Sequence, residues 1–315
     1  MSYPRASGVR NIGSATMRMI PEIFAGKLIE KLYAKTVFGE ISNTWYEGEI
    51  KKQGDVVHIR AMPSITIREH KSGGSLVYER PESTGVDLSI DQGAYWAFEE
   101  DDPDSVQTDL KGYINIWAEA ASTEMKVYID KIVLAGVVAD VHESNKGSTA
   151  GVISANIDLG TSGGTSLTLS NSDIVDKIMY AEQVLDEQNV PDEDRWIILP
   201  AWAKTRLNLS DLKNASITGD AKSPLRNGKI EGVQIGKFTP YISNQLSRAA
   251  DGSANTCTNI LFGQKMGITF ATQMVKNQMN IVNTESFGMR HRGLQVYGYK
   301  VIKPEAVGVM FARAA

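Results

Sequence analysis

The strongest periodic signal in the chain is a helical pattern between residues 105 and 138. Apolar side chains recur there in steps of three and four and would line one face of a helix, at Val106, Leu110, Ile114, Trp117, Ala121, Met125, Tyr128 and Ile132. The acidic cluster at residues 99–104 favours a helix start, because carboxylates stabilise the amino-terminal end of a helix. At a rise of ~1.5 Å per residue the predicted helix is roughly 50 Å long, and average helices have only about 11 or 12 residues.

A long hairpin is predicted ahead of this helix. Residues 54–62 (GDVVHIRAM) have the pattern of a strand, and a second candidate, SLVYE, begins at Ser75. The tetrapeptide at residues 71–74 (KSGG) is typical of a flexible turn, so residues 50–80 are expected to fold back on themselves. This segment has few apolar positions of its own. We therefore expect it to be stable only where it lies on another surface.

Two more strands are predicted between the hairpin and the helix. Thr84, Val86, Leu88 and Ile90 alternate with small or polar residues, which indicates a half-buried strand. A second strand is expected around residues 95–98, and the two are expected to pair. Before the hairpin, the first 20 residues show no sustained period and predict an extended arm. Apolar residues at near-helical spacing then predict a short amphipathic helix from Pro21.

The second half of the chain mixes helix and strand signals. Residues 142–170 are rich in Ser, Thr, Gly and Asn and mark a boundary, after which SDIVDKIMYAEQVLDEQ predicts a helix capped by Asn171 or Ser172. The run at residues 196–199 predicts a buried strand, and residues 230–285 contain several shorter ones. The tail has strand character and is expected to rejoin the sheet of the first region. The fold class is therefore α+β.

Composition excludes several protein classes. The 315 residues are 42% hydrophobic and 22% charged, as in ordinary globular proteins rather than disordered or fibrous ones. The single cysteine, Cys257, rules out an intramolecular disulfide framework and a site with several thiolate ligands. We find no membrane-spanning run of about 18 apolar residues and no signal-peptide pattern. Synthesis in the cytoplasm is expected.

Charge is distributed unevenly along the chain. The net charge is −4, yet residues 1–35 carry six Arg or Lys against two Glu, and residues 260–315 carry seven against two. The acidic excess therefore lies in the middle of the chain. Basic ends around an acidic centre suit contact with a polyanion, or with the acidic middle of a neighbouring copy. Scattered solvated charge is the alternative interpretation.

The motifs of catalysis and metal binding are weak or absent. Residues 160–164 (GTSGG) match the G-x-S-x-G pattern of a serine nucleophile, but a strand-like stretch rather than a helix follows Ser162. The one histidine downstream, His291, lies between two arginines that would oppose its protonation. We therefore interpret residues 160–164 as a glycine-rich loop. No catalytic residue, cofactor or metal site is expected, and the four histidines are far apart in sequence.

Nucleic-acid recognition in the usual sense is also not indicated. The chain shows neither a basic recognition helix nor aromatic residues interleaved with Lys and Arg. The basic N-terminal arm could still contact phosphates without reading sequence, which would make binding strongly dependent on salt.

The order of predicted elements resembles that of the major capsid proteins of tailed bacteriophages, the Hong Kong 97-like shell subunits. The segment IPEIFAGKLIEKLYAKTVFGEISNTWYEGEIKKQGDVVHIR resembles an N-terminal arm leading into an extended loop. VDLSIDQGAYWAFEEDDPD and the long helix resemble a peripheral domain with its spine helix, and RWIILPAWAKTRL with RNGKIEGVQIGKFTPYISNQL resemble an axial domain. The resemblance spans nearly the whole chain, and its motifs are structural rather than catalytic.

The resemblance implies a division of the chain into five parts. These are an N-terminal arm and short helix (1–49), an extended hairpin loop (50–83), peripheral-domain strands and spine helix (84–141), an axial domain (142–285), and a C-terminal strand returning to the peripheral domain (286–315). The loop and the arm would each contact a neighbouring subunit. The residues implied in those contacts are, in the loop, His58, Arg60, Arg68, Glu69, Lys71, Gly73 and Gly74, and, in the arm, Arg5, Arg10 and Arg18.

The resemblance also implies partners and a location. Such subunits form hexamers and pentamers that tile an icosahedral shell around non-specifically packaged double-stranded DNA. Portal, scaffolding and decoration proteins are expected partners, with no membrane. No long charged helical segment precedes Pro21, so a separate scaffolding protein, or none, is expected. The protein would reside in the virion capsid, and in the host cytoplasm before assembly. An encapsulin-type nanocompartment shell and a serine hydrolase using Ser162 are the alternative functions.

Overall fold

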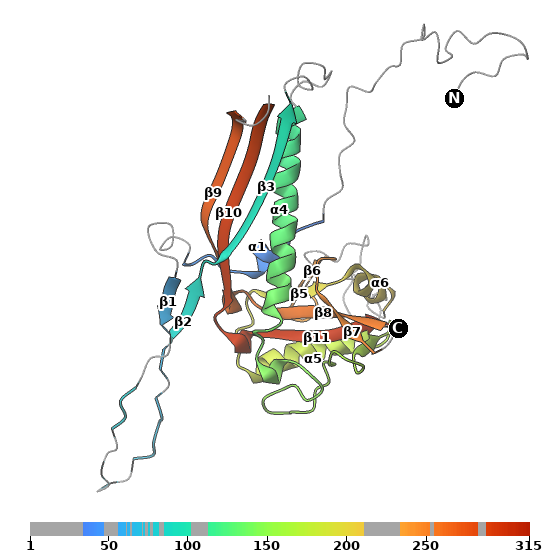
Figure 1. Ribbon diagram of the computed structural model, residues 1–315. Coiled ribbons are helices and arrows are strands. Elements are labelled where there is room, and N and C mark those ends of the chain that lie inside the picture. Colours follow the sequence, from blue (N-terminus) through green and yellow to red (C-terminus); the bar gives the residue numbers. More distant parts are fainter. Residues whose placement is uncertain are drawn as a thin grey trace, which may run out of the picture.

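The computed structural model shows an elongated part joined to a compact part (Figure 1). It describes residues 34–46, 56–60, 62–63, 65–70, 72, 75, 78–81, 85–101, 113–210, 234–252, 255–282 and 288–315. Each part is built around its own β-sheet, and both contain strands and helices. The predicted α+β class is therefore confirmed.

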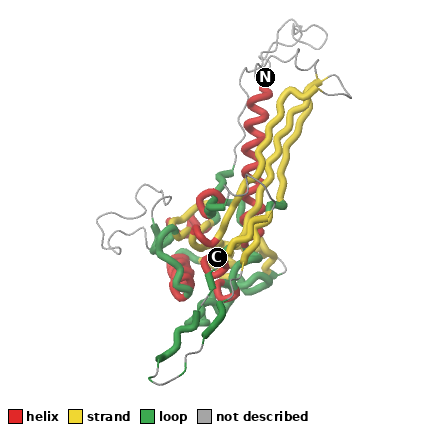
Figure 2. The backbone as a smooth tube through the Cα atoms, turned by 90° about the vertical axis from the view of Figure 1, so that its left-hand side faces the viewer, coloured by secondary structure: helices red, strands yellow, loops and turns green. Residues whose placement is uncertain are grey.

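The elongated part is a three-stranded antiparallel sheet with one helix along it. The sheet, called the long sheet here, has the order β3 (Gln92–Asp101), β10 (Gly288–Val301), β9 (Ile268–Val282). Helix α4 (Tyr113–Val137) contacts β3 and β10, and Figure 2 shows it beside the strands as a second layer. The helix has 25 residues and is roughly 37 Å long. The predicted long helix is thus confirmed over this range.

The buried face of α4 differs from the predicted stripe. Met125 is buried as expected, but the other buried apolar positions are Ile129, Val133, Leu134 and Val137. They lie in the second half of the helix, where it packs against the compact part. The predicted positions Trp117 and Tyr128 are instead about half exposed. The predicted stripe therefore lies toward the long sheet but is only partly covered, because the first half of α4 packs on that narrow sheet alone.

The compact part is a mixed sheet of six strands, called the compact sheet here. Its order is β4 (Leu167–Leu169), β11 (Val307–Ala314), β8 (Asn255–Gln264), β5 (Arg195–Leu199), β6 (Thr239–Ile242), and β7 (Arg248–Asp251) also pairs with β8. Helices α5 (Ile174–Glu187) and α6 (Ala201–Leu209) belong to the same part. The buried strand predicted at residues 196–199 is β5, and it is fully buried.

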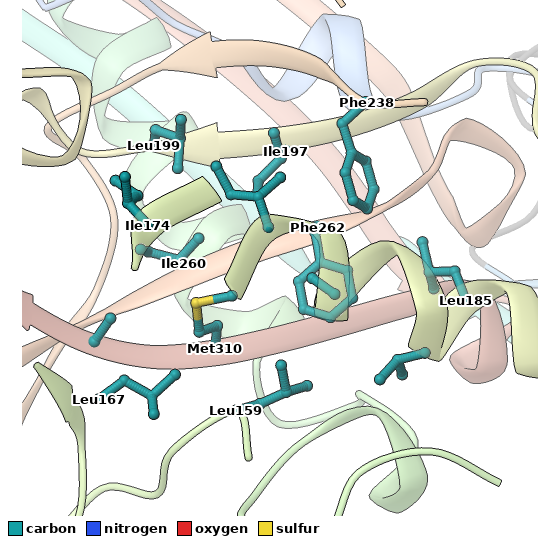
Figure 3. Packing of buried hydrophobic residues seen from close by; sticks show 14 of the residues in the cluster. Leu159, Leu167, Ile174, Leu185, Ile197, Leu199, Phe238, Ile260, Phe262 and Met310 are labelled. Carbon is teal, nitrogen blue, oxygen red and sulfur yellow. The ribbon is translucent and has the colours of Figure 1, made fainter. Parts of the chain in front are cut away.

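Alternating residues of the compact sheet face two different cores. Ile197, Ile260 and Phe262 point to the α5 side, where Figure 3 shows them packed with Ile174 and Leu185. The alternate residues of the same sheet point to the opposite side and pack against the second half of α4. They are Trp196, Ile198, Leu261, Val307 and Val309. Because successive side chains of a strand point to opposite faces, one sheet joins both cores. The compact sheet therefore fixes where the long helix is anchored.

Among the described residues, three short 3-10 helices and a small α-helix lie between the strands and helices of the two parts. They are η1 (Glu143–Asn145), η4 (Lys265–Gly267), η5 (Pro304–Ala306) and α1 (Phe38–Ile41). η4 links β8 to β9, and η5 links β10 to β11. Two continuous strand connections therefore run from one sheet to the other.

This connection corrects the expected placement of the C-terminal strands. β9 pairs with β10 in the long sheet, although residues 142–285 were expected to form one axial unit. β11 pairs with β8 and β4 in the compact sheet, although residues 286–315 were expected to return to the peripheral domain. Only β10 lies where the tail was expected. The apolar pattern indicates that these segments are strands, but it carries no information about which sheet they join.

Strand pairing near the hairpin also differs from the prediction. β1 (Val56–Arg60) pairs antiparallel with β2 (Gly85–Ser89), not with a strand starting at Ser75. β2 in turn does not pair with β3, which lies against β10. The chain between them crosses β10 closely, since a Cβ at Gly298 would lie 2.2 Å from the Ser89 carbonyl oxygen. Ile90, which follows β2, is buried at this crossing. The chain then enters the long sheet as β3 instead of turning back to pair with β2.

Two predicted local features have different outcomes. Helix α5 begins two residues later than the predicted segment, at Ile174, with Asp173 at the N-cap. The proposed caps were wrong: the hydroxyl of Ser172 donates to the Asp173 carboxylate, and Asn171 precedes the helix by three positions. The amphipathic helix expected from Pro21 lies almost entirely outside the described residues, and its last residues, 34–37, are not helical.

Asp130 of α4 fastens the start of α1 and carries a testable prediction. Its buried Oδ1 accepts the backbone N–H groups of Val37 at 3.0 Å and Phe38 at 2.8 Å. Burial raises the pKa of this carboxyl, against the opposite effect of the two donors. Asp130→Ala leaves both donors without an acceptor and should lower the free energy of unfolding by about 2–4 kcal/mol. Urea denaturation of the unassembled subunit measures this.

Asp130→Asn is the matched control, since its amide oxygen can still accept both hydrogen bonds. Its loss should be clearly smaller than that of the alanine variant. Equal midpoints for the alanine variant and the unmodified chain would contradict the assigned role.

Candidate functional site: assembly surfaces

The chain between β1 and β2, residues 61–84, is called the extended loop here. Its described part projects away from both sheets (Figure 1). Four large apolar side chains on it are strongly exposed: Met62 by 98%, Ile65 by 63%, Ile67 by 91% and Tyr78 by 87%. Exposed apolar residues concentrated in one segment mark an interaction site in a soluble protein. The extended loop therefore presents a surface suited to burial against another molecule.

Polar contacts alone join the two sides of the extended loop among its described residues. The Thr66 N–H donates to Glu79 Oε2 at 3.2 Å, and the Arg68 guanidinium pairs with the same carboxylate. Ion pairs at such exposed positions contribute about 0–1 kcal/mol. The described residues of the loop thus form no apolar core of their own, as the sequence predicted.

The predicted contact residues of the loop are only partly described. His58 is exposed on β1, with Nδ1 2.6 Å from the Oδ1 of its cross-strand partner Asp87. Arg60 is exposed at the end of the same strand, and Glu69 is exposed in the loop. The remaining predicted positions, other than Arg68, lie outside the described residues: Lys71, Gly73, Gly74, Arg5, Arg10 and Arg18.

A groove between β3 and α4 forms a second apolar surface. It has a volume of ≈ 340 Å³ and is lined by Gly93, Ala94, Tyr95, Trp96, Ala121, Glu124, Met125 and Tyr128. Tyr95 is 78% exposed and Tyr128 55% exposed. Farther along α4, Ile116 and Trp117 are also about half exposed and extend the apolar edge. Sequence reasoning missed this surface, because it treated the α4 stripe as core and could not align it with β3.

A third apolar surface is a tight loop held against α5. Val152 is 52% exposed and Ile153 is 80% exposed. The Glu187 carboxylate accepts the N–H groups of Ile153 at 2.9 Å and Ser154 at 3.0 Å. Burial would raise the pKa of Glu187, but these hydrogen bonds outweigh it and lower the pKa to about 2. The loop is therefore a preformed projection at neutral pH.

The serine motif does not form a nucleophile elbow. Thr161 and Thr165 form a β-bridge around Ser162, and strand β4 follows instead of a helix. His291 is buried in β10, opposite Phe98 of the long sheet, whereas Ser162 belongs to the compact part. Among the described residues, no group of three His, Cys, Asp or Glu side chains is placed to hold a metal ion. No helix in the described ranges is long and apolar enough to cross a membrane.

Comparisons with known proteins agree with an assembly role. The phage capsid protein family matches residues 97–309, more than half of the chain. A solved structure from Mycobacterium phage Che8 is 27% identical, with a TM-score of 0.73, and covers 92% of this chain and 96% of that chain. No curated protein sequence matches significantly.

Two solved capsids share the fold at lower identity. The capsid structure of the cyanophage P-SCSP1u is 18% identical, with a TM-score of 0.67, and covers 94% of both chains. The mature capsid of bacteriophage PhiM1 is 14% identical, with a TM-score of 0.65, and covers 100% of this chain and 99% of that chain. The exposed apolar surfaces, the Hong Kong 97-like arrangement of helix and sheets, and the family match lead to one conclusion. The chain belongs to the phage capsid protein family and is a structural major capsid protein of a phage shell.

Proposed function

We propose that the chain forms hexamers and pentamers that close into an icosahedral shell around double-stranded DNA. The observation that carries this proposal is the extended loop, whose apolar side chains are exposed in the single subunit. Fully burying each such side chain contributes about 1.5–3 kcal/mol before the costs of association. In a closed symmetric shell the same contact is repeated at every equivalent position, so its contribution is multiplied.

The extended loop of one copy would lie on the groove between β3 and α4 of its neighbour. Both surfaces are apolar, and both are exposed in the single subunit. The groove offers aromatic rings and the flexible side chain of Met125, which adapts to irregular partners. His58, Arg60, Arg68 and Glu69 would then contact the neighbour at the polar margin of this interface, where charged groups set orientation more than affinity.

Further partners and parts of the fold follow from the same proposal. The elongated part, formed by β3, α4, β9 and β10, would be the peripheral domain, and the compact part would be the axial domain. The arm within residues 1–49, with Arg5, Arg10 and Arg18, would contact another neighbour. Portal, scaffolding and decoration proteins would complete the particle. Subunits would assemble from the host cytoplasm.

Filling the groove tests the proposed interface. Ala121→Trp places a large ring where the loop would lie, without removing a buried side chain of the subunit. We expect the yield of shells, measured by light scattering and electron microscopy, to fall at least tenfold, while the circular dichroism spectrum of the subunit is unchanged. Lys126→Trp is the control, because Lys126 is exposed on α4 and does not line the groove. Normal shells from Ala121→Trp would contradict the loop-to-groove contact.

A further inference from the structure

A polar pocket lies among α6, β7, β8 and β11. Figure 1 shows these elements near the C-terminal end of the chain. The volume of the pocket is ≈ 380 Å³, and side chains from one helix and three strands line it. They are Trp202 of α6, Arg248 of β7, Asn255, Thr256 and Thr258 of β8, and Arg313 and Ala314 of β11. Among the described residues, the lining thus contains two guanidinium groups, an amide and two hydroxyls, and no carboxylate.

The two arginines differ in how they are held. Arg248 is exposed opposite Thr258 of β8, and no described residue accepts a hydrogen bond from its guanidinium. Arg313 is oriented from one side, since its Nε donates to Thr168 Oγ1 at 3.2 Å. Its Nη1 lies 3.6 Å from Asp251 Oδ2. The Arg313 guanidinium is therefore held in place, and the Arg248 guanidinium has N–H donors available for a ligand.

The acid that lies beside Arg313, Asp251, already accepts hydrogen bonds from a neighbouring turn. The Asp251 carboxylate is 2% exposed and accepts hydrogen bonds from the Gly164 N–H at 2.7 Å, the Ser166 N–H at 3.4 Å and the Ser166 hydroxyl. The Ser166 hydroxyl makes the largest contribution to lowering the pKa of Asp251. This carboxylate holds the turn before β4 and faces away from solvent. An anion entering the pocket would therefore meet an excess of positive charge.

The chemistry of the lining selects one class of anion. Guanidinium groups bind phosphate oxygens with several parallel hydrogen bonds, and hydroxyl and amide groups are frequent additional partners of nucleic-acid backbones. Trp202 adds a flat apolar wall, which suits the ring of a sugar better than an extended acidic side chain. We propose that this pocket binds a backbone phosphate of the enclosed DNA, with the adjoining deoxyribose against Trp202. This rests on the proposed function, in which the shell encloses DNA.

Salt-dependent binding of a duplex oligonucleotide to the unassembled subunit tests the proposal. Each phosphate contact contributes about 0.9 to the slope of log K against log salt concentration, which corresponds to roughly eightfold in affinity between 1 M and 0.1 M salt. The double variant Arg248→Ala with Arg313→Ala should therefore bind a 20-base-pair duplex at least about eightfold more weakly at 0.1 M salt. Its slope should be shallower by about 0.9 or more.

The matched control is Lys276→Ala with Arg292→Ala, which removes the same charge from exposed positions on the long sheet. It should change neither the affinity nor the slope. Unchanged binding in the pocket variant would overturn the proposal. Tighter binding of a poly-glutamate peptide than of the duplex, lost in the pocket variant, would also overturn it and would assign the pocket to protein carboxylates.

Shell formation separates this inference from the proposed function. If the pocket variant assembles into normal shells but has lost duplex affinity, the inference is supported. Normal shells with unaltered duplex binding overturn the inference and leave the proposed function standing. Failure of the unmodified chain to assemble overturns the proposed function itself.

Discussion

Replacing Ile65, Ile67 and Tyr78 of the extended loop with aspartate is expected to abolish shell assembly and to leave the subunit folded. The three side chains are 63–91% exposed in the subunit, so their replacement removes no intramolecular core contact. In the shell each would be buried, and an unpaired carboxylate is strongly unfavourable in an apolar contact. Sedimentation and light scattering measure assembly, and circular dichroism measures the fold.

A conservative triple variant provides the matched control for the loop. Ile65→Leu, Ile67→Leu and Tyr78→Phe keep the apolar character and nearly the same volume, so shells should still form. If the aspartate variant assembles as well as this control, the loop does not form the interface and the account of assembly is wrong.

Arg195 is expected to give the largest loss of stability of any single substitution considered for the compact part. Its side chain is fully buried, and Nε donates to the Pro191 carbonyl at 2.9 Å and Nη2 to the Val190 carbonyl at 2.5 Å. Its guanidinium also pairs with Asp186 at 2.7 Å and Asp192 at 3.0 Å. Arg195→Ala leaves the Pro191 and Val190 carbonyls without this donor and leaves buried volume empty, and should cost about 3–5 kcal/mol of unfolding free energy. Unfolding of the unassembled subunit in guanidinium chloride measures this loss.

A partly buried arginine in the same part, which makes fewer contacts, serves as the comparison. Arg206 donates to Asn171 Oδ1 at 3.4 Å and to the Ala315 carbonyl at 2.5 Å, contacts that lie at the surface or only partly buried. Arg206→Ala should cost about 1 kcal/mol or less. Equal losses for the two variants would show that Lys237, which also pairs with Asp186 and Asp192, can replace Arg195.

Local periodicity predicted the elements of this fold better than their partners. The helix at Tyr113–Val137 and the buried strand at Arg195–Leu199 follow directly from the spacing of apolar residues. The partner of β1 does not, because residues 75–79 and 85–89 both have strand character and only tertiary contacts choose between them. In the structure β1 pairs with residues 85–89, and the chain that follows them crosses β10 at buried Ile90.

The candidate sites show the same limit. The extended loop was predictable, because a hairpin with few apolar positions and no core of its own needs an external surface. The groove beside α4 was not, since it depends on β3 and α4 packing so that Tyr95 and Tyr128 line the same groove. The arginine pocket joins Trp202, Arg248 and Arg313, and no local pattern relates those positions.

Assembly of the purified chain is the most direct test of the central claim. Size-exclusion chromatography with light scattering, and electron micrographs of the earliest fraction, give the mass and shape of what forms. The account predicts uniform hollow shells, or pentamers and hexamers that convert to shells. A monomer or dimer that never assembles, even under crowding or with a co-expressed scaffolding protein, would contradict it.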